Sequence, residues 1–192
     1  LNDSGISAFV IHPLDGSLLL ADSSMGQLLK VNREGQIVAR ATVPLPDHPV
    51  LRLHDGLLLM NSAGGPGISV LRYEDTAFGQ QLDEILLLPP AAQKADQSGV
   101  RNFLWSGNSW WASLQNPESG SIGLYRFDHE WNYLDKVALP VDTGPLQLAS
   151  LGEKTLVNNP RHSALQRFSA QGAVEAPSVP AQLAVLIAGQ QR

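Results

Sequence analysis

The stretch that decides the fold is FVIHPLDGSLLLADSSMGQLLKVNREGQIVARATVPL, from Phe9 to Leu45. It contains four short apolar runs separated by turn-forming residues, and Asp15-Gly16 lies between the first two. Asp-Gly between apolar runs is a strong signal for a β-hairpin. The run at 17–20 lacks strict alternation, which suits a strand that is buried on both faces. The stretch therefore predicts one four-stranded antiparallel sheet.

Three later segments, at 51–89, 103–140 and 148–180, repeat this pattern. In each, a turn follows the first apolar run, polar residues end the second, the third carries a basic residue, and a proline closes the fourth. Four strands of about five residues, with their turns, fill a repeat of this size. We expect the basic residues to form ion pairs at the edges of the sheets. They stand 42, 54 and 41 residues apart, at Lys30, Arg72, Arg126 and Arg167.

A sheet-sized unit that recurs four times predicts an all-β protein of the β-propeller class. We expect four blades of about four antiparallel strands, at roughly 5–48, 49–98, 99–145 and 146–192, in a single propeller domain that spans residues 1–192. The blades could close as a four-bladed ring or belong to a larger propeller. In the second case, the remaining blades would come from further residues or from a second chain. An open arc would expose strand edges, which folded proteins avoid.

The first repeat also matches a known blade pattern. The matching residues are Val10, Asp15-Gly16, Leu19, Ala21-Asp22, Leu28, Val31, Glu34-Gly35 and Ile37. On these residues the repeat resembles the NHL-type blade and, more loosely, the gluconolactonase-like propellers. The resemblance implies the propeller fold. Lactonase-like enzymes of that group hold a divalent metal in the central channel through acidic and Asn side chains, but their ligand set has no clear match in this sequence.

Composition excludes several classes of function. The net charge is -5, and the 13 Lys and Arg residues never form a run of three, so a general nucleic-acid binder is not expected. There is no cysteine, which excludes disulfides and thiolate metal sites. No apolar stretch is long enough to span a bilayer. The chain begins at Leu1 rather than Met, which predicts a removed targeting segment or a longer parent protein. We expect a periplasmic or secreted location.

Polar residues that close the second run of each repeat are the main candidates for ligand binding. They are Asp22, Asn61, Asn116 and Asn158. Repeat symmetry would bring these side chains together as a ring at one end of the propeller. An oxygen-rich ring suits Ca²⁺, another divalent cation or a polar small molecule. The alternative is that these residues only cap strand ends and turns by bonding to nearby backbone.

Two histidines and a tryptophan complete the candidate set. His12 and His54 follow or end the first strands of repeats one and two, where a pair could bind a transition metal or act as a base. No HxH or HxxxH spacing is present, and a place in the turns is the alternative. The adjacent Trp110 and Trp111 must point to opposite faces of a strand. One could fill the space between blades, and the other, for which Trp111 is the candidate, could contact a ligand; packing in the core is the alternative.

These features predict a non-enzymatic propeller domain that binds a protein or a small ligand at one end. The alternative is a metal-dependent hydrolase of the lactonase or esterase type, with a divalent cation in the channel. The sequence contains no G-x-S-x-G nucleophile motif. The stretch 64–67 is rich in glycine but lacks the Lys-Ser/Thr of a phosphate loop, so we expect a flexible connection there.

Overall fold

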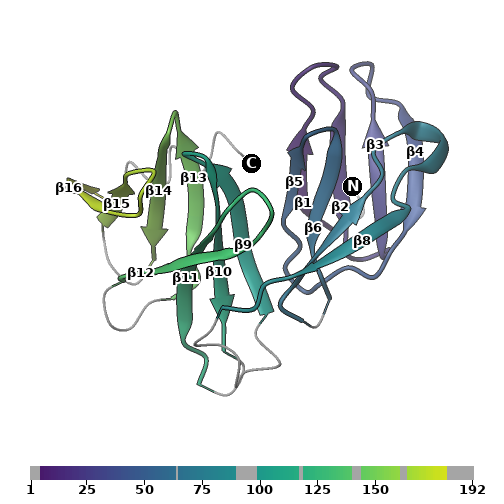
Figure 1. The fold of residues 1–192 in the computed structure, drawn as a ribbon. Helices are drawn as coiled ribbons and strands as arrows, with labels where there is room; N and C mark the ends of the chain where they lie inside the picture. The colour runs from purple at the N-terminus through teal and green to yellow at the C-terminus, as the bar shows by residue number, and fades with distance from the viewer. Residues whose placement is uncertain are drawn as a thin grey trace. The chain divides into compact units, whose positions relative to one another are not determined.

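The computed structural model describes residues 5–63, 65–89, 99–116, 119–139, 144–160 and 164–180. They form four antiparallel sheets of four strands and one 3-10 helix, η1, at Asp75–Ala77 (Figure 1). The chain divides into two compact units, Leu1–Leu86 and Leu87–Arg192, with two sheets in each. The predicted all-β propeller class with four four-stranded blades is confirmed. The assignment of the whole chain to a single domain stays a prediction.

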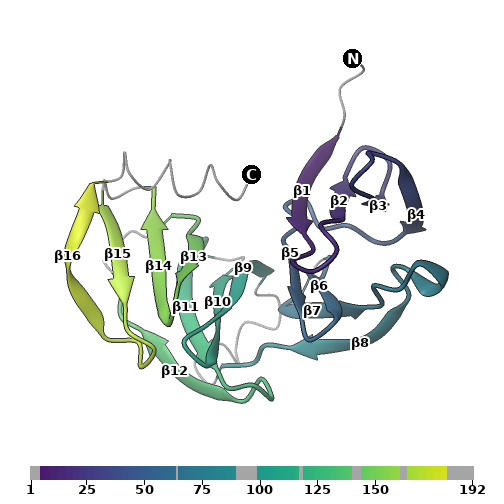
Figure 2. The ribbon, with the colours of Figure 1, turned by 90° about the horizontal axis from the view of Figure 1, so that it is seen from above.

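Unit 1 contains blades 1 and 2. In both blades the strands follow one another in chain order across the sheet, joined by hairpins. Strands β1 and β5, the first of each blade, lie side by side (Figure 2). Blade 1 consists of β1 (Ile6–Ile11), β2 (Leu18–Asp22), β3 (Gln27–Val31) and β4 (Ile37–Thr42). Blade 2 consists of β5 (Leu51–His54), β6 (Leu57–Asn61), β7 (Gly67–Leu71) and β8 (Gln81–Leu86).

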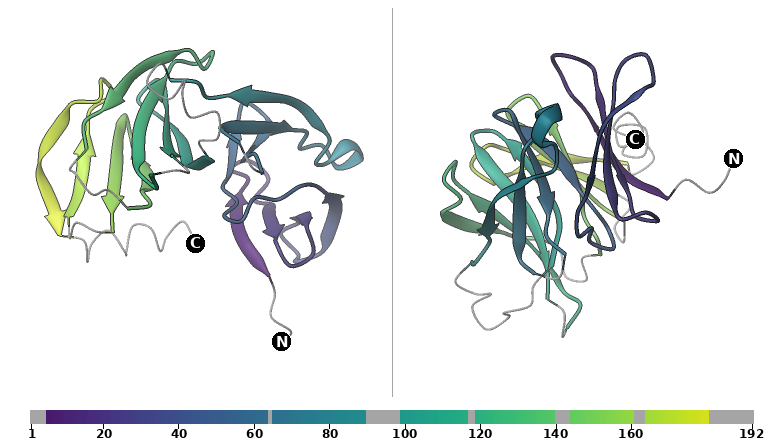
Figure 3. Two further views of the ribbon diagram at one scale, coloured as in Figure 1. Left: turned by 90° about the horizontal axis from the view of Figure 1, so that it is seen from below. Right: turned by 90° about the vertical axis from the view of Figure 1, so that its right-hand side faces the viewer.

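Unit 2 contains blades 3 and 4 with the same order of strands. Strand β9 contacts β13, so the first strands of the two blades are again neighbours. Strand β16 is the outer edge of blade 4 (Figure 3). Blade 3 consists of β9 (Gly99–Ser106), β10 (Ser109–Gln115), β11 (Ile122–Phe127) and β12 (Tyr133–Val137). Blade 4 consists of β13 (Gln147–Leu151), β14 (Lys154–Asn159), β15 (Ala164–Phe168) and β16 (Val174–Pro180).

The core of each unit is the space between its two blades. In unit 1 the side chains of Leu19 and Leu28 from blade 1 pack on Leu58 and Met60 from blade 2, and all four are at most 1% exposed. In unit 2 the ring of Trp111 packs on that of Phe168, with 5.8 Å between ring centroids. Strands with apolar residues on both faces allow a blade to bury one face against its neighbour.

A basic residue on the third strand links the two blades of each unit. Lys30 Nζ donates to the backbone carbonyl of Tyr73 in unit 1, and Arg126 donates to that of Ala170 in unit 2. Each carbonyl lies two residues beyond the third strand of the following blade. The predicted ion pairs are present, since Lys30 pairs with Asp75, Arg126 with Asp135, and Arg167 with Glu175.

Arg72 is the exception among the four basic positions. It pairs with Glu74 but lies one residue beyond β7 rather than within it. The connection from β7 to β8 contains η1, so it is longer than the corresponding turns and shifts the spacing of the repeat.

One turn in unit 2 carries a tryptophan in a left-handed conformation. The turn from β11 to β12 places Trp131 at φ 67°, while Gly35 and Gly172 hold the corresponding place, at φ 80°, in blades 1 and 4. A bulky residue is strained there, at a cost of about 1–2 kcal/mol. The ring of Trp131 stacks on that of Trp110 with 4.2 Å between centroids, and this contact offsets the strain.

The packing between blades 3 and 4 generates a stability prediction. Replacing the fully buried Phe168 by Ala should lower the free energy of unfolding of unit 2 by about 3–5 kcal/mol, because it removes apolar contacts and leaves a cavity. Denaturant unfolding followed by tryptophan fluorescence measures the change. Val174→Ala is the matched control, since Val174 is 56% exposed in the same sheet and its loss should cost less than about 0.5 kcal/mol. Equal losses would contradict the assigned core.

Candidate functional site

The strand-end polar residues of unit 1 are engaged within the fold. Asp22 ends β2, and its Oδ1 accepts hydrogen bonds from the backbone N–H groups of Ser24 (3.0 Å) and Met25 (3.2 Å). Asn61 ends β6, accepts from the N–H of Val50 (2.7 Å) and donates to the carbonyl of His48 (3.0 Å). Asp22 therefore closes a turn, and Asn61 ties the entry of its own blade to β6.

In unit 2 the two strand-end residues, Asn116 and Asn158, have different hydrogen-bonding roles. Asn116 follows β10 and accepts from the N–H of Ser119 (3.1 Å), which again closes a turn. Asn158 lies one residue before the end of β14 and donates to Gln147 (2.9 Å). The buried Asn159, which the sequence analysis passed over, resembles Asn61, because its Oδ1 accepts from the N–H of Gly144 ahead of the first strand (3.3 Å).

No metal centre is evident in the part of the chain that the structure describes. No group of three His, Asp or Glu side chains there is placed to hold an ion. The predicted ring of Asp22, Asn61, Asn116 and Asn158 joins residues of both units and stays a prediction. Among the described residues, no helix has the length and apolar character that a membrane span requires.

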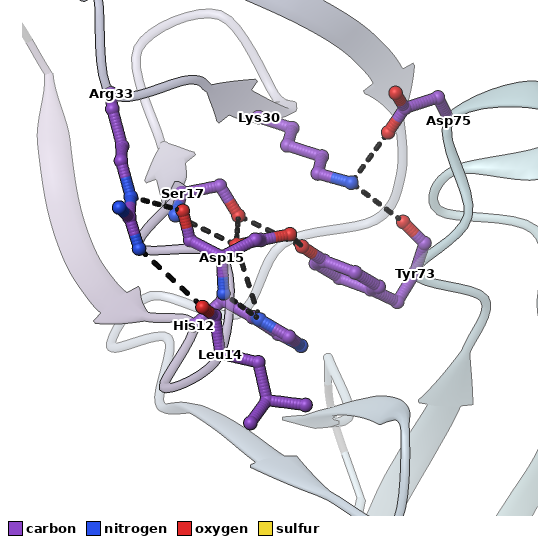
Figure 4. Close-up of polar contacts among 8 residues, drawn as sticks. All are labelled: His12, Leu14, Asp15, Ser17, Lys30, Arg33, Tyr73 and Asp75. Atoms are coloured by element: carbon purple, nitrogen blue, oxygen red, sulfur yellow. Dashed lines mark hydrogen bonds and ion pairs between the residues drawn. The ribbon is translucent and has the colours of Figure 1, made fainter.

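Blades 1 and 2 meet in a polar cluster that contains His12 (Figure 4). The imidazole stacks on the ring of Tyr73, with 4.4 Å between centroids, and its Nδ1 lies 3.1 Å from Asp15 Oδ1. The hydroxyl of Tyr73 donates to the second carboxylate oxygen of Asp15, and the hydroxyl of Ser17 donates to the first (2.6 Å). Lys30 closes the cluster, with its ammonium 3.8 Å from the centre of the Tyr73 ring.

Burial and hydrogen bonding set the charges in this cluster. Partial burial opposes ionisation of Asp15, but hydrogen bonds from Ser17 and Tyr73 outweigh it and hold the pKa of Asp15 well below its usual range. Burial and the bond to Asp15 raise the pKa of Tyr73. Burial opposes the charge of Lys30, yet its bonds to Asp75 and Tyr73 raise the pKa of Lys30. The cluster thus contains an ionised carboxylate, a neutral phenol and an ammonium.

This arrangement is suited to holding the blades together rather than to nucleophilic catalysis. Ser17 donates its proton to Asp15, so the carboxylate stands between the hydroxyl and the imidazole of His12. The group that accepts this hydrogen bond is Asp15, and its lowered pKa makes it a weak base. His54, the other predicted histidine, lies 3.4 Å from Asp55 rather than in this cluster. We refer to His12, Asp15, Ser17, Lys30, Tyr73 and Asp75 as the inter-blade latch.

The tryptophans of blade 3 lie in two different environments. Trp111 is completely buried between blades 3 and 4, and its Nε1 donates to the carbonyl of Ser106 (3.2 Å). Trp110, on the opposite face of β10, is 2% exposed and contacts the rings of Trp105 and Trp131. One of the two adjacent rings therefore packs between blades, as predicted. That ring is Trp111, which was the candidate for contact with a ligand.

A cavity of about 360 Å³ lies between blades 1 and 2. Pro44, Val43 and Thr42 form one wall where the chain leaves β4, and strands β6, β7 and β8 form the other. Its volume falls in the range of small-molecule sites. Blade 2 lines the cavity with Met60, Ser62, Ala63, Ser69, Leu71, Gly79, Gln81 and Glu84.

Polar groups meet on one side of this cavity. The hydroxyls of Ser62 and Ser69 lie 3.2 Å apart, and Ser69 is 8% exposed. A Cβ on Gly67 would fall 2.6 Å from Glu84 Oε1 and 2.8 Å from Ser62 Oγ, so the bare glycine lets both oxygens approach. The glycine-rich stretch that the sequence analysis treated as a loop thus ends at a residue that shapes the site.

Sequence reasoning missed this cavity. Its walls come from residues about 20 to 40 positions apart, and none belongs to a known motif. One signal was available: Ser69 interrupts the otherwise apolar β7, which reads GISVL. A buried hydroxyl in an apolar strand needs a hydrogen-bonding partner and so marks a polar interior site.

No protein-family model matches the sequence, and no curated protein sequence is similar to it. Solved structures with a similar fold do exist. Streptogramin B lyase is 17% identical with a TM-score of 0.65, over 94% of this chain and 56% of that protein. Virginiamycin B lyase from Staphylococcus aureus is 14% identical with a TM-score of 0.63, over 95% of this chain and 58% of that protein. Regucalcin from Agrobacterium tumefaciens, a calcium-binding protein, is 13% identical with a TM-score of 0.58, over 92% of this chain and 59% of that protein.

At these identities the comparisons show the β-propeller fold alone. The chain spans little more than half the length of these three propellers. The class that the fold and site define is therefore an all-β propeller with a cavity between two of its blades.

The latch predicts how stability depends on pH. Because the pKa of Asp15 is lower in the folded state than in the unfolded chain, its stabilising effect is present above the unfolded pKa of about 3.9 and is lost as pH falls below it. Wild type should lose more free energy of unfolding than Asp15→Asn between about pH 6 and pH 2.5. Denaturant unfolding at each pH measures this. The exposed Glu34→Gln is the control. A steeper loss in Asp15→Asn than in wild type would refute the latch.

Proposed function

We propose that this chain is a ligand-binding domain of a β-propeller and that its site is the cavity between blades 1 and 2. The observation that carries the proposal is the cavity itself, which combines an apolar floor with hydroxyl, amide and carboxylate groups on one side. Binding sites for small organic molecules have this composition, with a few polar groups that orient the ligand. The proposed role is recognition without catalysis.

Two further observations support a role for this cavity. The side chains that the sequence suggested as ligands, Asp22, Asn61 and His12, already bond to other parts of the fold. Among the similar propellers, virginiamycin B lyase has a structure with quinupristin.

The two methionines provide the test. Met60 lines the cavity and is 1% exposed, whereas Met25 lies in blade 1 and is 60% exposed. Titration with 4-phenylbutanol, a neutral amphipathic probe, should shift the ¹³C-methyl signal of Met60 saturably and leave that of Met25 unchanged. Ser69→Leu, which fills the cavity, should abolish the shift. An unmoved Met60 signal in wild type would refute this site.

The metal-dependent hydrolase remains the competing proposal, and regucalcin, named as a calcium-binding protein, is the observation that favours it. That proposal requires Asp22 to bind a cation. Its Oδ1 already accepts three hydrogen bonds, one of them from the hydroxyl of Ser24 at 2.6 Å. We therefore expect Ca²⁺, Mg²⁺, Mn²⁺ and Zn²⁺ to leave the melting temperature unchanged. A rise that Asp22→Ala abolishes would favour the hydrolase.

A further inference from the structure

The charge on the polar side of the cavity comes from Glu84. Its partner across the sheet on β7 is Ser69, and Ser69 in turn faces Met60 on β6, so the three side chains form one row that ends at the cavity. Among the described residues, the carboxylate of Glu84 forms no ion pair. It lies over Gly67 beside the hydroxyl of Ser62. A carboxylate and two hydroxyls together offer an acceptor-rich surface.

The opposite side of the cavity is apolar. Met60 and Leu71 are 1% and 2% exposed, and Val43 and Pro44 face them from the chain that leaves β4. Met60 and Leu71 are already covered, so the apolar surface still open to a ligand is mainly that of Val43 and Pro44, and this surface favours an apolar portion in the ligand. A simple metal ion would leave this side without a partner. The cavity volume of about 360 Å³ also exceeds what a single ion needs.

We infer that the cavity binds a small organic cation, an ammonium with an apolar body, whose charged end pairs with Glu84. The inference rests on the proposed function, because it names the ligand class of the same site. The ammonium would donate to the Glu84 carboxylate and to the hydroxyls of Ser62 and Ser69, which matches its three N–H donors. The apolar body would lie on Val43 and Pro44. An anion would meet like charge at Glu84 and gain nothing there.

Three probes with one skeleton separate charge from shape: 4-phenylbutylamine, 4-phenylbutanol and 4-phenylbutyrate. Their dissociation constants are read from the Met60 methyl shift, with Met25 as the internal reference. The amine should bind at least about threefold more tightly than the alcohol, and the butyrate more weakly than either. Glu84→Gln should weaken binding of the amine more than binding of the alcohol, so that the preference for the amine is lost.

Asp83→Asn is the matched control. Asp83 precedes Glu84 on β8, pairs with Val70 instead of Ser69, and does not line the cavity. Its Oδ1 accepts the N–H of Glu84 at 2.8 Å, and an Asn keeps an oxygen there. Asp83→Asn should therefore retain the preference for the amine. Added salt should weaken binding of the amine more than binding of the alcohol, because only the amine carries a charge that salt screens.

The outcomes separate the two proposals. If all three probes shift Met60 with equal affinity, the cavity binds small molecules but the inferred class is wrong. The same holds if Asp83→Asn and Glu84→Gln reduce the preference for the amine equally. If none of the probes shifts Met60, the inferred class and the proposed function both fail. Tight binding of the amine that Glu84→Gln selectively weakens supports both.

Discussion

Face-to-face packing of one blade on the next is the constraint on which the rest of the structure depends. A single sheet of five-residue strands cannot bury its own apolar side chains, so a blade is stable only beside another blade. In unit 1, Leu19 and Leu28 become buried only because Leu58 and Met60 cover them. Each such side chain contributes about 1.5–3 kcal/mol when fully buried. The pair of blades is thus the smallest part of this chain that has a core.

Apolar packing is not directional, and the third-strand cations add hydrogen bonds between specific positions of neighbouring blades. Lys30 and Arg126 occupy the same place in the two units and reach carbonyls at the same place in the following blades. Both are more than 90% buried, where an unpaired charge would be costly, and both are paired with aspartates. The cation therefore gains its full set of partners only when the blades are correctly aligned. In unit 1 the aromatic ring of Tyr73 extends this contact to the turn that carries Asp15.

The sequence predicted the strands well because their signals are local. Asp-Gly turns and apolar runs act within one hairpin, and all sixteen predicted strands are present. Features that depend on a neighbouring segment were harder to predict. Val70 rather than Arg72 holds the place of the other cations within β7. The burial of Asn159 rather than Asn158 depends on the chain that enters blade 4. The cavity combines the end of β4 with the far half of blade 2, and no pattern in either segment indicates that they meet.

The latch and the cavity illustrate two uses of charge at one pair of blades. In the latch, Lys30 of blade 1 bonds to Tyr73 and Asp75 of blade 2. Asp15 bonds to residues of both blades, so the charges of Lys30 and Asp15 are satisfied by folding itself. In the cavity, the carboxylate of Glu84 lies beside hydroxyls but forms no ion pair with the described residues, so its charge is available to a molecule from solution. The net charge of -5 gives the surrounding field the same sign as this carboxylate. Local geometry and overall charge therefore both favour the positive end of the ligand that we infer.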